Sequence, residues 1–166
     1  MGARVAIGLS SNLGDKLLFL RRACVSLSGS MKVTAVSSVY ETGPMYLTDQ
    51  PDFINAVLIG TTELGPLALL TRLKETERGL GRQDRGRNGP REIDLDIVAY
   101  GSLALRSQAV TVPHPRAFER RFVLQPLVEV DPSFRLPGFG LAQDLLSRPD
   151  VMKQQVKRIS DAHLLL

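Results

Sequence analysis

The order in which apolar patterns follow one another along the chain limits its fold more than any other feature. Residues 4–10 form a short β-branched and apolar run, and residues 32–42 and 53–63 have the composition and alternation of strands. Helical periodicity fills the intervals after the first and third of these runs, and an apolar run at 92–100 predicts a fourth strand. The order β-α-β-β-α-β predicts an α+β fold, with two helices packed on a ferredoxin-like sheet.

Both predicted helices have recognisable ends. Asp15 is suited to cap the first helix, which we expect to run to about Ser28. Pro66 suits the first position of the second helix, and Gly79 and Gly81 are suited to end it.

The last third of the chain has weaker patterns. We predict a short strand at 109–113 and a helix near 117–129 that is interrupted around Pro126. The final stretch, 151–166, is predicted to be a surface helix or a frayed end.

Length and composition suit a single folded unit. With 166 residues, 43% of them hydrophobic, we predict one domain over 1–166, with a core at about 4–130 and a C-terminal extension and tail at 131–166. A net charge of +4 favours an anionic ligand, whether nucleotide, nucleic acid or lipid headgroup. A single cysteine leaves no intrachain disulfide, and no run approaches the ~20 apolar residues of a membrane span. We therefore expect a cytoplasmic protein without signal peptide or membrane partner.

Two acids occupy the fourth predicted strand. Side chains alternate along a strand, so Asp94 and Asp96 share one face, and the apolar residues around them face the core. Their backbone positions are about 6.5–7 Å apart, and like charges at such a separation need a positive partner. Arginines could fill that role, and so could Mg²⁺, which prefers one or two carboxylates together with phosphate oxygens and water.

Two connections are longer than their positions require, namely 43–52 and 81–91. The second connection is rich in glycine and contains or ends in Arg82, Arg85, Arg87 and Arg91. Such a loop beside a dicarboxylate strand suits polyphosphate chemistry, because guanidinium groups bind phosphate oxygens in a bidentate manner. On these residues alone, idle surface loops and an edge strand with two solvated acids remain the alternative.

A second basic cluster lies at 114–122, where His114 stands between two prolines and Arg116 and Arg120 are spaced as neighbours on a helix. The chain contains no Walker A sequence, no GxGxxG and no GxSxG, which argues against P-loop, Rossmann and α/β-hydrolase enzymes. Two histidines and one cysteine are too few for a Cys/His zinc site.

Four stretches together carry a family resemblance. They are AIGLSSNLGD (6–15), SSVYETGPMYLTDQPDFINAV (37–57), GPREIDLDIVAYG (89–101) and TVPHPRAFERRFVLQPL (111–127). In sequence and order they resemble the 6-hydroxymethyl-7,8-dihydropterin pyrophosphokinase family of folate biosynthesis. The resemblance implies a ferredoxin-like fold and transfer of the β,γ-pyrophosphoryl group of ATP to the pterin, with release of AMP. It also implies two Mg²⁺ ions, with ATP and the pterin as small-molecule partners of a monomer.

The resemblance further implies roles for individual residues. The implied catalytic residues are Arg82, Arg91, Asp94 and Asp96, of which the two acids bind the metal ions. The implied ATP-binding residues are Lys74, Glu77, Arg82, Arg87, Arg91, Ile97, Thr111, His114 and Arg120. The implied pterin-binding residues are Thr42, Gly43, Pro44, Phe53, Asn55 and Phe122. An asparagine can both donate and accept hydrogen bonds, as the edge of a pterin requires, and the two phenylalanines can supply aromatic walls.

Two other functions are weighed against this one. Ferredoxin-like sheets with basic loops also bind RNA through stacked aromatic residues, but aromatic residues make up only 5% of this chain and there is no tryptophan. An inactive homologue is the third possibility, and the intact acids and arginines argue against it. The sequence departs from the family at three positions: some members have Trp in place of Asn88, Tyr in place of Phe53 and an aromatic residue in place of Pro115.

Overall fold

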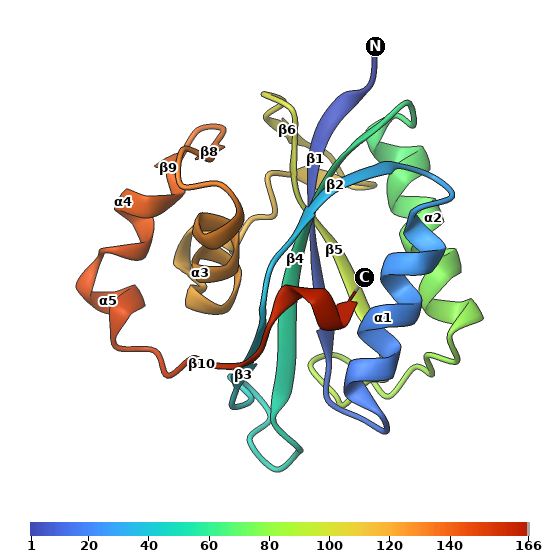
Figure 1. Cartoon of the computed structure of the whole chain (residues 1–166), viewed down its shortest axis with the longest axis vertical. Coiled ribbons are helices and arrows are strands. Elements are labelled where there is room, and N and C mark those ends of the chain that lie inside the picture. The colour runs from blue at the N-terminus through green and yellow to red at the C-terminus, as the bar shows by residue number, and fades with distance from the viewer. Residues whose placement is uncertain (166) are drawn as a thin grey trace.

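A single antiparallel sheet organises the molecule, a computed structural model that describes residues 1–165 (Figure 1). Its strands are β1 (Ala3–Ser11), β2 (Lys32–Val36), β3 (Val39–Thr42), β4 (Phe53–Thr62), β5 (Asp94–Tyr100) and β10 (Lys157–Ser160). They are arranged in the order β10-β3-β4-β1-β5, with β2 also paired to β4. Every pairing in this sheet is antiparallel.

Helices cover both faces of the sheet. They are α1 (Lys16–Leu27), α2 (Pro66–Gly79), α3 (Arg121–Val130), α4 (Ala142–Leu146) and α5 (Pro149–Met152), with 3₁₀ turns η1 (Ala117–Glu119) and η2 (Ala162–Leu165). Two small hairpins, β6 (Leu105–Arg106) with β7 (Thr111–Val112) and β8 (Arg135–Leu136) with β9 (Gly140–Leu141), complete the chain. Figure 1 shows α1 and α2 on one side of the sheet and α3 to α5 on the other.

The two faces of the sheet have separate hydrophobic cores. The first core joins α1 and α2 to the sheet and contains fully buried residues such as Leu20, Leu73 and Leu95. The second core lies beneath α3 and contains Leu124 and Val98. Residues 94, 96 and 98 alternate onto the α3 side of β5, so the two acids project from the sheet beyond the part of this face that the second core covers.

The expected strands and helices of the first hundred residues are present, with one correction. The predicted strand 32–42 is two strands, β2 and β3, separated at Ser37 and Ser38. The Ser37 hydroxyl accepts a hydrogen bond from the Val57 amide at 2.9 Å, and the Ser38 amide donates to Glu129 on α3 at 2.9 Å. These side-chain hydrogen bonds compete with the backbone hydrogen bonds that would continue one strand through Ser37 and Ser38, and the strand is therefore interrupted there.

The predicted interruption at Pro126 is wrong. Helix α3 continues through Pro126 to Val130, and the break lies earlier, at Arg120, whose backbone is extended between η1 and α3. Burial of Leu124 and Leu127 in the second core holds the helix together despite the missing proline N–H.

The prediction of a surface helix or frayed end at 151–166 is also wrong. Strand β10 pairs with β3, and Leu165 is buried in the first core. Without β10, the edge of β3 would present unpaired backbone groups, which is why an extended segment adds to it. The last residue of that prediction, Leu166, lies outside the described residues. Within residues 1–165, no helix has the length and apolar character needed to cross a membrane.

Candidate functional site

Strand register places three polar side chains in a row across the sheet. Ser10 of β1 is paired with Asp94 of β5 on one side and with Asn55 of β4 on the other. Two residues before Asn55 on β4, and so on the same face of the sheet, Phe53 pairs with Thr42 of β3. Paired residues project to the same face, so these side chains form the floor of one site.

A cavity of about 320 Å³ lies above this floor. The predicted site residues on its wall are Thr42, Gly43, Phe53, Asn55, Arg91, Asp94, Asp96, His114, Arg120 and Phe122. A neighbouring hollow of about 380 Å³ is lined by Lys74, Glu77 and Arg82, and Arg91 borders both spaces. Residues from four separate parts of the sequence therefore meet at one end of the sheet.

The first cavity has an aromatic end. The guanidinium carbon of Arg91 lies 5.3 Å from the ring centroid of Phe53, and that of Arg120 lies 5.5 Å from the centroid of Phe122. Asn55 is buried, and its amide nitrogen lies 3.4 Å from the carbonyl oxygen of Tyr40. Two aromatic rings and a buried amide on the wall of one cavity suit a flat heteroaromatic ligand.

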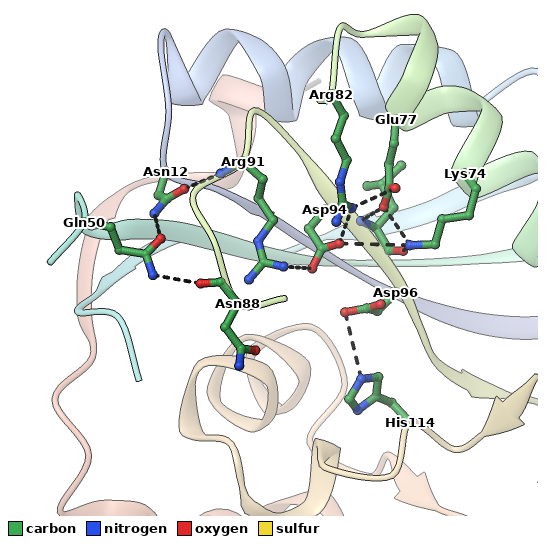
Figure 2. Close-up of polar contacts among 11 residues, drawn as sticks. Asn12, Gln50, Lys74, Glu77, Arg82, Asn88, Arg91, Asp94, Asp96 and His114 are labelled. Atoms are coloured by element: carbon green, nitrogen blue, oxygen red, sulfur yellow. Dashed lines mark hydrogen bonds and ion pairs between the residues drawn. The ribbon is translucent and has the colours of Figure 1, made fainter. Parts of the chain in front are cut away.

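Asp94 is surrounded by cations (Figure 2). Its Oδ1 lies 2.5 Å from Nη1 of Arg82 and 4.0 Å from Nζ of Lys74, and its Oδ2 lies 3.5 Å from Nη1 of Arg91. Burial acts to raise the pKa of Asp94, but the charges of Arg91, Lys74 and Arg82 outweigh it and hold the pKa below its usual range. Asp94 is therefore ionised at neutral pH.

Asp96 has a different environment. Removal from bulk water raises the pKa of Asp96, and the neighbouring charge of Asp94 raises it further. Nε2 of His114 lies 4.0 Å from the Asp96 carboxylate (Figure 2). A positive charge between the two carboxylates would relieve their repulsion.

The hydrogen bond at Nδ1 of His114 determines which ring nitrogen carries the proton. Nδ1 of His114 accepts a hydrogen bond from the Arg116 amide at 3.1 Å, so the neutral ring has its proton on Nε2, on the side of Asp96. Burial lowers the pKa of His114, while the charge of Asp96 opposes that shift. At neutral pH the ring is an uncharged hydrogen-bond donor to the site.

Glu77 is buried beneath the cations and does not itself face open solvent. Its carboxylate accepts from Lys74 Nζ at 2.8 Å and from the Leu95 amide at 2.7 Å, and it lies 2.8 Å from Arg82 Nη1. Burial raises its pKa, although Lys74 acts in the opposite direction. Through these contacts Glu77 positions two cations and the start of β5.

Two arginines at the cavity retain unused hydrogen-bonding capacity. Nε of Arg91 and Nε of Arg120 are buried and have no hydrogen-bond partner among the residues that the structure describes. Burial lowers the pKa of Arg120, and the positive charge of Arg116 lowers it further. Because a crowded, desolvated guanidinium gains most from an added anion, the part of the cavity wall formed by Arg91 and Arg120 is suited to phosphate.

Asn12 connects the two long loops and was not anticipated from the sequence (Figure 2). Its Nδ2 donates to Gln50 Oε1 at 2.9 Å and to the Pro51 carbonyl at 3.0 Å, and its Oδ1 accepts from the Arg91 amide at 2.8 Å. Gln50 in turn donates to the Asn88 carbonyl at 3.0 Å. Asparagines in turns are mostly exposed, so a turn motif gave no sign that this one is 1% exposed.

Sequence reasoning also missed four residues of the first cavity, and four predicted site residues line neither of the two hollows. Ser10, Met45, Tyr46 and Asn88 line the cavity without having been predicted. Pro44, Arg87, Ile97 and Thr111 line neither hollow. The Ile97 side chain is buried in the first core, so it could reach a ligand only through its main chain, and Thr111 belongs to the β6–β7 hairpin.

Solved structures share this fold. A Plasmodium falciparum HPPK-DHPS structure with pterin and p-hydroxybenzoate aligns with a TM-score of 0.73 at 13% identity, over 96% of this chain and 45% of that chain. A second structure, of an HPPK-DHPS in complex with substrates, has a TM-score of 0.71 at 12% identity, over 87% of this chain and 42% of that chain. At such identities the likeness establishes a mixed α and β fold with an antiparallel sheet.

Sequence comparisons are more specific. The mitochondrial folate synthesis bifunctional protein of Arabidopsis thaliana is 46% identical over 127 residues, which are 76% of this chain and 23% of that protein. The chain thus spans about a quarter of the length of this relative. The 2-amino-4-hydroxy-6-hydroxymethyldihydropteridine pyrophosphokinase of Bacillus subtilis is 42% identical over 75% of both chains, and that of Aquifex aeolicus is 37% identical over 79% of this chain and 82% of its own.

The family model described as 7,8-dihydro-6-hydroxymethylpterin-pyrophosphokinase (HPPK) matches residues 6–132, which include β2 to β5, most of β1, the helices α1 and α2, and all the cavity residues named above. The match and the two full-length relatives lead to one assignment: this chain belongs to the HPPK family.

Proposed function

We propose that this protein transfers the pyrophosphoryl group of ATP to 6-hydroxymethyl-7,8-dihydropterin. In this reaction the hydroxymethyl oxygen attacks the β-phosphorus of ATP, and the bond from that phosphorus to the oxygen shared with the α-phosphate breaks. AMP, the pterin diphosphate and a proton are released. Family membership supports the proposal, as does the pyrophosphokinase activity for which the Bacillus and Aquifex relatives are named.

One observation carries the proposal. An acid pair, two arginines whose buried Nε atoms have no partner among the described residues, and the rings of Phe53 and Phe122 border the same cavity. The carboxylates suit hard cations, the guanidinium groups suit phosphate oxygens, and the rings suit a flat heterocycle. Few ligands other than a metal-bound polyphosphate together with a pterin-like ring would use all three.

Within this proposal the ring of the pterin lies between Phe53 and Phe122, with Asn55 at its edge. The polyphosphate then extends past Asp94 and Asp96 toward the hollow lined by Lys74, Glu77 and Arg82. Arg91 borders both spaces, so its guanidinium is suited to bind the group that moves from one substrate to the other.

The residues present fit Mg²⁺ as an ion shared with substrate. No cluster of three or more His, Cys, Asp or Glu residues suited to a metal occurs in the described part of the chain. Two carboxylates alone match the preference of Mg²⁺ for one or two protein ligands completed by phosphate oxygens and water. We propose that Asp94 and Asp96 hold two such ions, which when bound would supply positive charge to the phosphate oxygens.

The protein's own side chains then have electrostatic and positioning roles. Arg82 and Lys74, held by the buried Glu77, maintain positive charge beside the polyphosphate. His114 can donate from Nε2, and Arg120 offers a guanidinium group in a desolvated wall. Phosphoryl-type transfers need little covalent help from the protein, so positioning and charge supply the rate enhancement.

Finer features of the fold belong to the same proposal. We propose that the strand order β5-β1-β4-β3, with α1 and α2 on one face, is ferredoxin-like. The antiparallel pairing and the mixed α and β content support it.

The test is to incubate the protein with MgATP and the hydroxymethyl pterin and identify the nucleotide product by chromatography. The proposal expects AMP that depends on both the pterin and Mg²⁺, and its loss in Asp96→Asn. Formation of ADP, or turnover without the pterin, would contradict it. Salt-sensitive RNA binding without ATP turnover would instead support the RNA-binding alternative.

A further inference from the structure

The segment after α5 contacts two of the elements that carry the candidate site. It runs from α5 through β10 along the edge of β3, on the side of the sheet where α3 lies (Figure 1). A hollow of about 500 Å³ is bordered by residues 152–157 and by the end of β3, and its lining includes Thr42, Arg121 and Gln154. The segment follows residues 6–132, the part of the chain that matches the family model.

Gln154 lies beside the N-terminus of α3. Its Oε1 accepts a hydrogen bond from the Arg121 amide at 2.9 Å, and its Nε2 donates to the Glu119 carbonyl at 2.7 Å. The first amides of a helix have no intrahelical partner, and α3 has no capping side chain at its own N-cap residue. Gln154 therefore caps α3 from 33 residues further along the chain.

The two bonds lie on either side of Arg120. Glu119 ends η1 and Arg121 begins α3, so a single side chain fixes the backbone immediately before and after Arg120. Arg120 and Phe122, which border the cavity, depend on this backbone for their direction. Nε of Arg120 has no hydrogen-bond partner within the described residues, and the Arg120 guanidinium carbon lies 5.5 Å from the Phe122 ring centroid, so both side chains follow the backbone that Gln154 holds.

Arg121 strengthens the same junction from the other side. Its Nη1 donates to the carbonyls of Met152 and Gln154, both at 2.8 Å. Next to these residues, β10 pairs Lys157 with Glu41, which precedes Thr42 of the cavity wall. The segment is thus bonded to the start of α3 at one end and to the end of β3 at the other.

We propose that Gln154 is a positioning residue for the reaction, acting through Arg120 and Phe122. It touches no substrate, and its function is to hold the turn between η1 and α3 so that the guanidinium and the ring meet phosphate and pterin at the correct distance. The inference rests on the proposed function, since it assigns those two side chains to the two substrates. Misplacement of about 1 Å can reduce a rate by about a hundredfold, so loss of this restraint has a measurable effect.

The experiment compares Gln154→Ala with Gln155→Ala, a matched control at an exposed neighbouring residue. Steady-state kinetics with the pterin and ATP are measured at 25 °C, together with thermal unfolding. We expect kcat/KM for the pterin to fall about tenfold to a hundredfold in Gln154→Ala, with unfolding still well above 25 °C, and to stay unchanged in Gln155→Ala. Gln154→Glu retains the acceptor for the Arg121 amide but loses the donor to Glu119, so its kcat/KM should lie between those of the alanine variant and the unaltered protein.

The outcomes separate the two proposals. If Gln154→Ala unfolds at a lower temperature but has unchanged kcat/KM at 25 °C, Gln154 only stabilises the fold and the assignment is wrong. The assignment also fails if Gln154→Glu is as impaired as Gln154→Ala. If the unaltered protein forms no AMP, the proposed function itself fails, and the assignment fails with it.

Discussion

Replacing Asn12 with alanine should uncouple the two long loops from each other and from β1. Asn12 makes three side-chain hydrogen bonds, two as donor to the 43–52 loop and one as acceptor from the Arg91 amide. Asn12 is only 1% exposed, so water cannot readily replace these hydrogen-bond partners.

The size of the effect follows from these bonds. At about 1 kcal/mol for each intramolecular hydrogen bond, the loss is about 3 kcal/mol of the free energy of unfolding. For a domain of this length, 1 kcal/mol corresponds to about 2–4 °C, so Asn12→Ala should unfold about 6–12 °C below the unaltered protein. Arg91 borders both substrate hollows, so kcat/KM should fall as well.

Asn12→Asp is the matched variant, because it keeps the acceptor for the Arg91 amide and loses both donated bonds. Thermal and urea unfolding of the three proteins measure stability, and steady-state kinetics measure turnover. The aspartate variant should lose at least the two donated bonds, about 2 kcal/mol, because its new carboxylate oxygen also faces the Pro51 carbonyl without a donor between them. A change below about 0.5 kcal/mol in Asn12→Ala would refute the view that Asn12 holds the loops together.

Further predictions concern the acids and the arginine loop. Asp96→Asn should remove most turnover and leave the circular dichroism spectrum unchanged, because the carboxylate faces the cavity; near-normal turnover would exclude a metal role. Arg82→Ala should slow a single turnover more than it weakens ATP binding, and the reverse result would make Arg82 a binding group only. Hydrogen bonds from Arg85 lower the pKa of Glu92 from 4.5 to about 2, so the stability that Glu92 contributes is fully present above pH 4.5 and is lost as the pH falls toward 2. Urea unfolding should show a smaller loss of stability over this pH range in Glu92→Gln than in the unaltered protein, because carboxylates such as Asp94 still titrate in the variant. Hydrogen exchange in the 81–91 loop should slow when a nonhydrolysable ATP analogue and Mg²⁺ are added, and unchanged exchange would show that the loop does not close.

The sequence predicted the features that depend on local pattern. Alternation along 92–100 was enough to put Asp94 and Asp96 on one face, and the structure has them on the α3 side of β5 with Leu95 buried on the other. Whether a segment forms a strand or a helix could also be predicted from the spacing of its apolar residues, because each strand or helix buries the face that carries them.

What could not be predicted depends on contacts between distant segments. Asn12 meets Gln50 and Arg91 only because β1 ends where both loops return, and nothing in a turn motif indicates that meeting. Gln154 likewise caps a helix that begins 33 residues earlier, and no local pattern indicates such a cap. The interruption between β2 and β3 at Ser37 has the same origin. The Ser37 hydroxyl accepts a hydrogen bond from the amide of Val57, twenty residues further along the chain.

The most direct test of the proposed reaction follows the two phosphoryl groups separately. Single turnovers are run in parallel with ATP labelled at the β-phosphate and with ATP labelled at the γ-phosphate, and the pterin product is isolated. Attack at the β-phosphorus predicts that both labels reach the pterin in equal amounts, with AMP as the only nucleotide product. Transfer of the γ label alone, with ADP retaining the β label, would contradict the account.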